Sequence, residues 1–191
     1  MATHMEIEVK LRWERDAPAA RSFLERLGYQ LKKPRIHECN QLFDRPGAEL
    51  QSRDQLLRLR RAGDRAIVTY KGPSQRARHK SREEIEFEVS NPENFAEVLD
   101  RLGYLPGFRY EKYRTELAIP EEPGVVTIDE TPMGVFLELE GPAEWIDRTA
   151  ARLGFRQSAY LTASYPGLYW EFRSSHPEAP ADMVFGSGKP L

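Results

Sequence analysis

The segment Met5–Trp13, with the sequence MEIEVKLRW, alternates charged and aliphatic residues. Glu6, Glu8 and Lys10 occupy every second position, with an aliphatic residue after each. Because successive side chains of a β-strand point to opposite faces, the segment predicts a strand with one ionic face and one aliphatic face. The ionic face is either the solvent side of a sheet or the wall of a site that handles charge.

Composition narrows the class of protein. The chain has 191 residues, of which 40% are hydrophobic and 30% are charged, so one domain with its own core is expected. With a net charge of -2, the chain lacks the strong positive electrostatic field that is typical of a nonspecific nucleic-acid binder. No apolar run approaches the roughly 20 residues of a membrane helix. We therefore expect neither nucleic acid nor a membrane as a partner.

The cysteine count and the C-terminal composition add two expectations. Cys39 is the single cysteine, which excludes a disulfide framework and a cysteine-based zinc site and fits a reducing, cytoplasmic setting. The segment 174–191 is rich in proline, glycine and serine, which is typical of a flexible extension. The folded domain is thus predicted to span residues 1–173.

Three stretches of the chain, 5–31, 83–106 and 136–157, resemble one another. Each begins with Glu-x-Glu in an alternating segment, continues through a proline and ends in Arg-Leu-Gly-aromatic. The prolines are Pro18, Pro92 and Pro142, and the glycines are Gly28, Gly103 and Gly154. Proline suits the first turn of a helix and glycine the position just past its end. The repeated unit is therefore predicted to be a strand followed by a helix.

The remaining alternating segments bring the number of predicted strands to about eight, mostly antiparallel neighbours. These strands are expected at 6–13, 35–44, 55–62, 65–72, 82–89, 108–119, 125–131 and 134–140. Nearly every one has an aliphatic face and an ionic face. If the strands close into a barrel with the helices outside, the ionic faces point inward.

A dry interior of this kind would be strongly destabilising, since an uncompensated buried charge costs several kcal/mol. Arginine and lysine clusters suit phosphate oxygens, and carboxylate clusters suit Mg²⁺ or Mn²⁺. The two together indicate a site for a metal-bound polyphosphate, although for any single strand a solvated face is the simpler interpretation.

The charged segments follow one another in an order that resembles the CYTH-domain proteins, the triphosphate tunnel metalloenzymes. They are EIEVK, LRLRR…TYKGP, SREEIEFEV, EKYRTEL, VTIDET and FLELEG, within residues 5–172. The resemblance implies an α+β fold in which an eight-stranded antiparallel closed β-barrel forms a tunnel with helices outside. It also implies dependence on Mg²⁺ or Mn²⁺, action on a triphosphate-containing small molecule, and a monomer or homodimer.

The resemblance assigns roles to particular residues. The implied metal ligands or additional metal contacts are Glu6, Glu8, Glu84, Glu86, Asp129, Glu138 and Glu140. The implied substrate-binding residues are Lys10, Arg58, Arg60, Lys71, Lys112 and Arg114. Turnover is expected to depend on Glu6, Glu8, Lys10, Arg58, Arg60 and Lys71.

Three functions fit this constellation. The first is a metal-dependent triphosphatase acting on inorganic triphosphate or an organic triphosphate such as thiamine triphosphate or a nucleotide. The second is a class IV adenylyl cyclase, in which the ribose 3′-hydroxyl attacks the α-phosphate of ATP and releases pyrophosphate. The third is a non-catalytic polyphosphate- or nucleotide-binding module.

The segment 71–84 contains a basic run between two predicted strands. Its basic residues are Arg76, Arg78, His79, Lys80 and Arg82. The run is interpreted either as a solvated hairpin loop or as a mobile lid that draws an anionic substrate toward the site.

Overall fold

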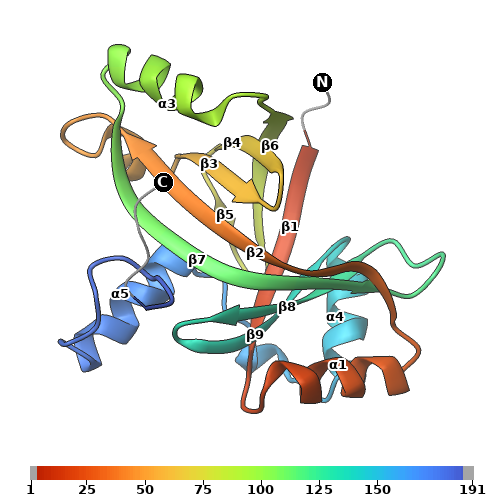
Figure 1. Ribbon diagram of the computed structural model, residues 1–191. Coiled ribbons are helices and arrows are strands. Elements are labelled where there is room, and N and C mark those ends of the chain that lie inside the picture. The colour runs from red at the N-terminus through yellow and green to blue at the C-terminus, as the bar shows by residue number, and fades with distance from the viewer. Residues whose placement is uncertain (1–3, 187–191) are drawn as a thin grey trace.

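The computed structural model describes residues 4–186, and its centre is an antiparallel β-barrel (Figure 1). The strands are β1 (His4–Trp13), β2 (Gln30–Asp44), β3 (Leu56–Ala62), β4 (Arg65–Lys71), β5 (Gln75–Arg76), β6 (Lys80–Glu88), β7 (Leu105–Ala118), β8 (Val125–Thr131) and β9 (Gly134–Glu140). The helices are α1 (Ala17–Arg26), α2 (Glu49–Ser52), α3 (Pro92–Arg101), α4 (Ala143–Arg152), the 3-10 turn η1 (Gln157–Ala159) and α5 (Tyr165–Ser175). The predicted strands are all present, with ends that differ by a few residues.

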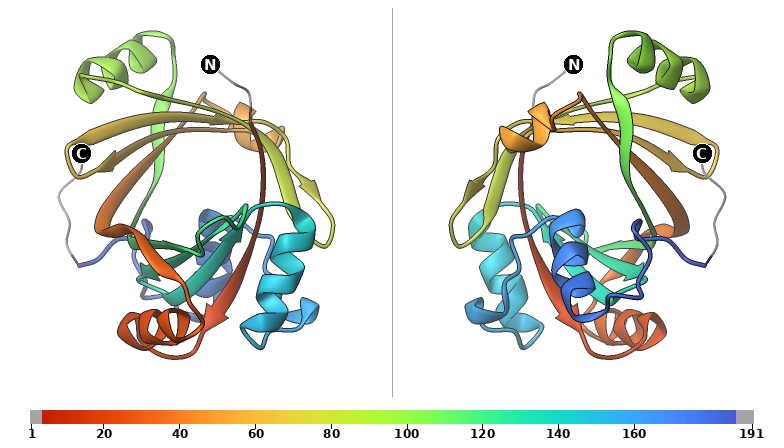
Figure 2. Two further views of the ribbon diagram at one scale, coloured as in Figure 1. Left: turned by 90° about the vertical axis from the view of Figure 1, so that its right-hand side faces the viewer. Right: turned by 90° about the vertical axis from the view of Figure 1, so that its left-hand side faces the viewer.

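The barrel is closed by a pairing between its first strand and a strand from the middle of the chain. The strand order is β1-β9-β8-β7-β2-β3-β4-β6, and β1 pairs with β6 to complete the ring, which places Glu8 opposite Lys80. The two-residue β5 pairs only with β6. Eight antiparallel strands therefore form the closed barrel that the sequence predicts, and Figure 2 shows it from both sides.

The three repeated strand–helix units are confirmed. Asp16 and Asn91 accept hydrogen bonds from the backbone N–H groups of Ala19 and Asn94 and so cap α1 and α3. Pro142 precedes α4 directly. The glycine after each helix has a positive φ of 81° to 90°, a conformation that favours glycine over residues with a Cβ.

The helices cover the aliphatic faces of the strands, on the outside of the barrel. Leu24 of α1 and Ile146 of α4 pack on the outward residues of β1, β8 and β9, such as Leu11 and Leu137, and all four are fully buried. Helix α3 places Leu99 on the outward face of β3 and β4. Burial of one such side chain contributes about 1.5–3 kcal/mol. The apolar core is therefore outside the barrel wall, and the ionic faces point inward.

Helix α5 was not predicted, and it lies across the lower part of one end of the barrel (Figure 2, right). Tyr165 and Leu168 pack there against Phe136 and Tyr110, whose side chains belong to the inward faces of β9 and β7. The apolar residues at this end therefore form a second core, which α5 completes.

The segment after α5 differs from the predicted flexible extension as far as Gly186. Met183 is fully buried, and its backbone bonds to Arg109 and Glu111 of β7. The hydroxyl of Tyr169 donates to the carbonyl oxygens of Pro180 and Asp182. Residues 1–3 and 187–191 lie outside the described part of the chain.

Among the described residues, no helix combines the length and the hydrophobicity needed to cross a membrane.

Candidate functional site

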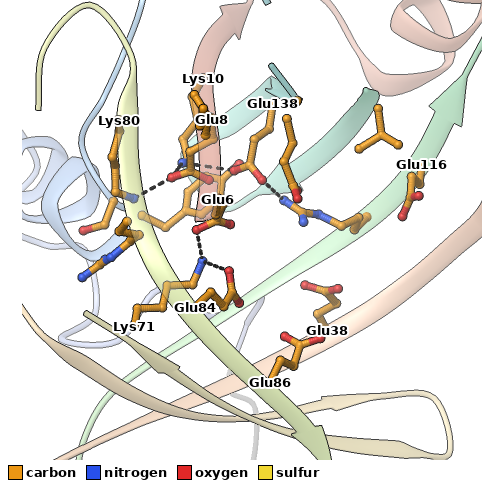
Figure 3. Close-up of a pocket in the computed structure, with 18 of the residues that line it drawn as sticks. Glu6, Glu8, Lys10, Glu38, Lys71, Lys80, Glu84, Glu86, Glu116 and Glu138 are labelled. Atoms are coloured by element: carbon orange, nitrogen blue, oxygen red, sulfur yellow. Dashed lines mark hydrogen bonds and ion pairs between the residues drawn. The ribbon is translucent and has the colours of Figure 1, made fainter. Parts of the chain in front are cut away.

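The ionic strand faces enclose a cavity of about 860 Å³ inside the barrel (Figure 3). It is lined by every predicted site residue except Asp129. These residues are Glu6, Glu8, Lys10, Arg58, Arg60, Lys71, Glu84, Glu86, Lys112, Arg114, Glu138 and Glu140. Charges from distant parts of the chain thus converge on one space, as the alternation predicts.

Three of the carboxylates on β1 and β9, those of Glu6, Glu8 and Glu138, are paired with buried lysines. The Lys71 ammonium lies 2.6 Å from Glu6 Oε2, and the Lys10 ammonium lies 2.9 Å from Glu8 Oε1 and 3.1 Å from Glu138 Oε2. The β1–β9 register explains the contact between Lys10 and Glu138, because these two residues lie opposite each other. This part of the lining therefore carries both signs of charge.

The arginines of β3 and β7 form the opposite part of the lining. Arg58 Nη2 lies 3.8 Å from Glu84 and 3.7 Å from Glu86, and Arg114 Nη2 donates to Glu138 Oε1 at 2.7 Å. Arg60 Nη1 lies 3.3 Å from Glu38 Oε1. Their guanidinium groups can present planar, two-point contacts to phosphate oxygens.

Asp129 lies behind the lining and is fully buried. Its carboxylate accepts hydrogen bonds from Lys112 Nζ at 2.8 Å, from Arg114 Nε at 2.7 Å and from the Tyr165 hydroxyl at 2.6 Å. With its oxygens engaged in this way, Asp129 contacts the cationic residues from behind and is not among the residues that line the cavity.

Lys80, Arg82, Glu38 and Tyr165 line the cavity as well, and the sequence argument did not assign them to the site. The Lys80 ammonium lies 2.5 Å from Glu8 Oε1. Alternation along 80–86 would have identified Lys80 and Arg82, since they share a face with Glu84 and Glu86. No local pattern identifies Tyr165, because its position depends on where α5 packs.

The basic run therefore matches neither interpretation as a whole. Lys80 and Arg82 lie in β6 and are buried inside the barrel, where Arg82 donates to the carbonyl oxygens of Gly72 and Asp54. Outside the barrel, Arg78 Nη2 and His79 Nε2 lie 2.9 and 2.8 Å from the Asp147 carboxylate of α4. The turn before β6 is thus tied to α4.

The four carboxyl groups on β1 and β9 have pKa values that shift in different directions. Burial raises the pKa of Glu140 to about 7, and the charges of Glu6 and Glu138 add to the shift. Burial and the Glu8 charge raise the pKa of Glu6 despite Lys71. For Glu8, burial is outweighed by Lys10 and Lys80, which lower its pKa. Negative charge is thus least compensated near Glu6 and Glu140.

The donor set fits a hard divalent cation by its chemistry. Oxygen ligands from carboxylates suit Mg²⁺ and Mn²⁺, and Glu140 has no hydrogen bond or ion pair among the described residues. In the same part of the chain, no three carboxylate, histidine or cysteine side chains converge in metal-binding geometry. Instead the carboxylates of Glu6, Glu8 and Glu138 contact lysines. Metal binding therefore requires some of these ion pairs to rearrange.

A model of the CYTH domain matches residues 4–153 of the chain. This protein belongs to the CYTH family. A Methanocaldococcus jannaschii relative named "putative adenylate cyclase" is 29% identical over 143 residues, which are 71% of this chain and 76% of the relative. Members of the CYTH family are cyclases or triphosphatases that bind triphosphate substrates and generally depend on divalent metals.

Solved structures of CYTH-fold proteins superpose on the barrel. The PH1819 protein of Pyrococcus horikoshii OT3 is 25% identical, with a TM-score of 0.73 over 88% of this chain and 99% of that one. A Hippeastrum protein, HpAC1, is 20% identical, with a TM-score of 0.62 over 89% of this chain and 96% of that one. The second similarity shows the fold alone. The predicted closed barrel with external helices is confirmed.

Proposed function

We propose that this CYTH-family protein is a divalent-metal-dependent triphosphatase that binds its substrate inside the barrel. The observation that carries the proposal is the convergence of two kinds of charge on one cavity. Lysines and arginines from β1, β3, β4, β6 and β7 line the space together with carboxylates from β1, β6 and β9. Neither kind alone would bind a metal-complexed polyphosphate, and the two together match its phosphate oxygens and its cation.

The cationic residues have two roles in this proposal. Arg58, Arg60, Lys112 and Arg114 bind the phosphate chain and hold it in a single orientation. Lys10 and Lys71 neutralise the charge that develops on the leaving phosphate. All six lie at the cavity surface on strands of the barrel, so their positions are set by the sheet.

The carboxylates of Glu6, Glu8, Glu138 and Glu140 would hold the cation, with Glu84 and Glu86 as further contacts. A cation there would polarise phosphate oxygens and lower the pKa of water for in-line attack on the terminal phosphorus. Asp129 supports the reaction indirectly, since it fixes Lys112 and Arg114.

Two proteins similar to this chain bear on the choice between hydrolysis and cyclisation. The Hippeastrum protein is described as a "putative adenylyl cyclase" that reveals a dominant triphosphatase activity. That pairing of a cyclase name with a triphosphatase activity shows that the name alone does not decide the reaction. The name of the Methanocaldococcus jannaschii relative makes adenylyl cyclase the second candidate for this chain.

The lining of the cavity favours hydrolysis over cyclisation. A cyclase must hold the adenine and ribose of ATP so that the 3′-hydroxyl reaches the α-phosphate. Among the described residues, the aromatic side chains in the lining are Tyr110 and Tyr165. Arg58 donates to the Tyr110 hydroxyl, and the Tyr165 hydroxyl donates to Asp129. The ammonium groups of Lys10 and Lys112 lie over the Tyr165 ring, 5.2 and 4.9 Å from its centroid, and the Tyr110 ring packs against Phe108 and Tyr165, so both rings are already engaged within the protein.

A substrate panel tests the proposal. Inorganic triphosphate, thiamine triphosphate and ATP are each incubated with Mg²⁺ or Mn²⁺, and orthophosphate, pyrophosphate and cyclic AMP are measured separately. Metal-dependent orthophosphate release supports the triphosphatase. Cyclic AMP with an equal amount of pyrophosphate would replace it with the cyclase, and tight binding without any product would leave a binding module.

Two variants connect the activity to the cavity. Glu6→Gln and Arg58→Ala are each expected to lower kcat/KM by roughly 100-fold or more, since each removes a charge that acts on the phosphates or the cation. Circular dichroism should show that both retain the fold. Arg35→Ala, which removes an exposed ion pair with Glu130 outside the barrel, is the control and should keep full activity. Full activity in both cavity variants would contradict the site.

A further inference from the structure

The groups proposed to bind metal and the groups proposed to bind phosphate are paired with each other in this structure. Dashed lines in Figure 3 join Lys71 to Glu6 and Lys80 to Glu8. Lys10 is shared between Glu8 and Glu138. A cation that takes up these carboxylates must therefore compete with ammonium groups that are already in place.

Lys80 is the clearest of these lysines. It enters the cavity from β6, directly opposite Glu8 in the β1–β6 register, and its side chain is only 4% exposed. Glu8 is its single ion-pair partner among the described residues, and both Lys80 and Lys10 contact the same oxygen, Oε1, at 2.5 and 2.9 Å. Glu8 thus has one ammonium more than its charge requires.

If Lys80 left, Glu8 would keep a partner. Lys10 lies 2.9 Å from Glu8 and 3.1 Å from Glu138 and would still compensate the Glu8 charge. A buried carboxylate without a partner would be costly. The Lys80–Glu8 pair is the one that can separate, because Glu8 then keeps Lys10 as its partner. Lys80 lies at the cavity surface, where a phosphate oxygen can take the place of Glu8.

We infer that Lys80 is an exchangeable counter-ion of the site, which pairs with Glu8 until a divalent cation replaces it and then pairs with the polyphosphate. The inference rests on the proposed function and adds a substrate-binding residue to it. The cation and the polyphosphate then assist each other. The cation releases the Lys80 ammonium for phosphate, and the phosphate releases the Glu8 carboxylate for the cation.

The consequence is reciprocal coupling between the two ligands. The cation alone, or the polyphosphate alone, must break the Lys80–Glu8 ion pair and leave one of the two residues without this partner. When both bind, the Lys80–Glu8 pair is replaced by a cation–Glu8 contact and a phosphate–Lys80 contact. By linkage, the factor by which metal strengthens polyphosphate binding equals the factor by which polyphosphate strengthens metal binding. We expect this factor to be about 10-fold or larger, within the usual range of coupling between sites.

Isothermal titration calorimetry on the full chain tests the inference without turnover. The ligands are Mn²⁺ alone, the β,γ-imido analogue of ATP alone in EDTA, and each in the presence of the other. The analogue has a complete triphosphate chain and resists hydrolysis of its terminal phosphate. The variants are Lys80→Gln and the control Arg65→Gln, which removes an exposed ion pair with Glu88.

In Lys80→Gln, Mn²⁺ alone should bind about 5-fold tighter than in the wild type, while the coupling factor falls toward one. The Arg65→Gln control should match the wild type in both. Unchanged or weaker Mn²⁺ binding in folded Lys80→Gln would overturn the inference. That result would mean that Lys80 does not compete with the cation for Glu8 and has only a structural role. A wild-type coupling factor near one would also overturn it, and this measurement does not depend on the variant folding.

The calorimetry tests the role of Lys80 and the substrate panel tests the triphosphatase activity, so either proposal can be refuted while the other is retained. Metal-dependent hydrolysis together with uncoupled binding would refute the role of Lys80 and retain the triphosphatase. Coupled binding without any product would support the counter-ion exchange and refute the hydrolysis.

Discussion

Asp129 accepts hydrogen bonds from Lys112, Arg114 and Tyr165 and contributes nothing to the surface of the cavity. Its negative charge is fully buried, so its pairing with two cations is what makes it tolerable. It also joins β7, β8 and α5 at one point. The positions of Lys112 and Arg114 therefore depend on a carboxylate that does not line the cavity.

Asp129→Asn is expected to reduce both stability and activity. Loss of the charge leaves two buried cations with a neutral partner, which should cost about 3 kcal/mol of unfolding free energy. Misplaced Lys112 and Arg114 should lower kcat/KM by roughly 100-fold. Urea unfolding and steady-state kinetics measure the two effects. Glu130→Gln, the next residue on β8 and paired with exposed Arg35, is the control and should change stability by less than about 1 kcal/mol.

Glu38 gives the protein a defined pH dependence. Burial opposes its ionisation, but Arg60, Lys112 and Arg114 outweigh burial and lower its pKa from 4.5 to about 2. A carboxyl group whose pKa is lower in the folded state stabilises the fold above its unfolded pKa. That contribution is lost as the pH falls from 4.5 toward 2.

Glu38→Gln should therefore destabilise the protein at pH 7 by on the order of 3 kcal/mol, and by progressively less as the pH falls below 4.5. The measurement is urea unfolding of the wild type and the variant at a series of pH values from 7 downward. A difference between the two proteins that stays constant over this range would refute the lowered pKa.

At the scale of the elements, the position of α4 against the barrel depends on the absence of a side chain at Gly124. A Cβ at this position would overlap the indole ring of Trp145, which is buried in α4. The same ring donates its Nε1–H to Glu122 at 2.6 Å and so has little freedom to move. Helix α4 and the start of β8 are thereby locked together.

Gly124→Ala is accordingly expected to destabilise the protein by about 2 kcal/mol, the usual cost of overpacking a rigid contact. Gly107→Ala is the matched control, since the nearest atom to a Cβ there is the Leu42 carbonyl oxygen at 3.8 Å, an ordinary contact. Thermal unfolding should show a lower Tm for the first variant alone. Equal Tm values for both variants would indicate that α4 can shift.

The segment after α5 makes a testable contribution of its own. Met183 is fully buried against β7 and α5, whereas Met5 is 58% exposed. Met183→Ala should lower the unfolding free energy by about 2 to 3 kcal/mol, and Met5→Ala by less than about 0.5 kcal/mol. Denaturant unfolding compares the two. Similar small effects would mean that the C-terminal segment contributes little to the stability of the barrel.

At the scale of the whole molecule, closure of the barrel places the charged faces of its strands around one ionic interior. Alternation identified which face of each strand is charged and which is aliphatic, and the repeated proline and glycine identified α1, α3 and α4. These features are local, because the pleat of a strand and the turn of a helix repeat over a few residues. The charged lining of the cavity was predictable for the same reason.

The partners of the charged residues were not predictable in this way. Lys80 contacts Glu8 across 72 positions in the sequence, and Tyr165 contacts Asp129 across 36. The periodicity of a strand defines its faces but not its neighbour, so only the β1–β6 pairing brings Lys80 to Glu8. Likewise, only the packing of α5 on Phe136 and Tyr110 brings Tyr165 behind the cationic residues.

The sequence by itself therefore determined most of the elements, though not α5, together with the inward charge, and it indicated the kind of ligand that such charge suits. The tertiary structure decided which opposite charges neutralise one another, which carboxylate is withdrawn from the cavity, and that α5 lies across the lower part of one end of the barrel. The physical reason is that charge–charge energies depend on distance and burial, and both are set by contacts between segments that are far apart in the chain.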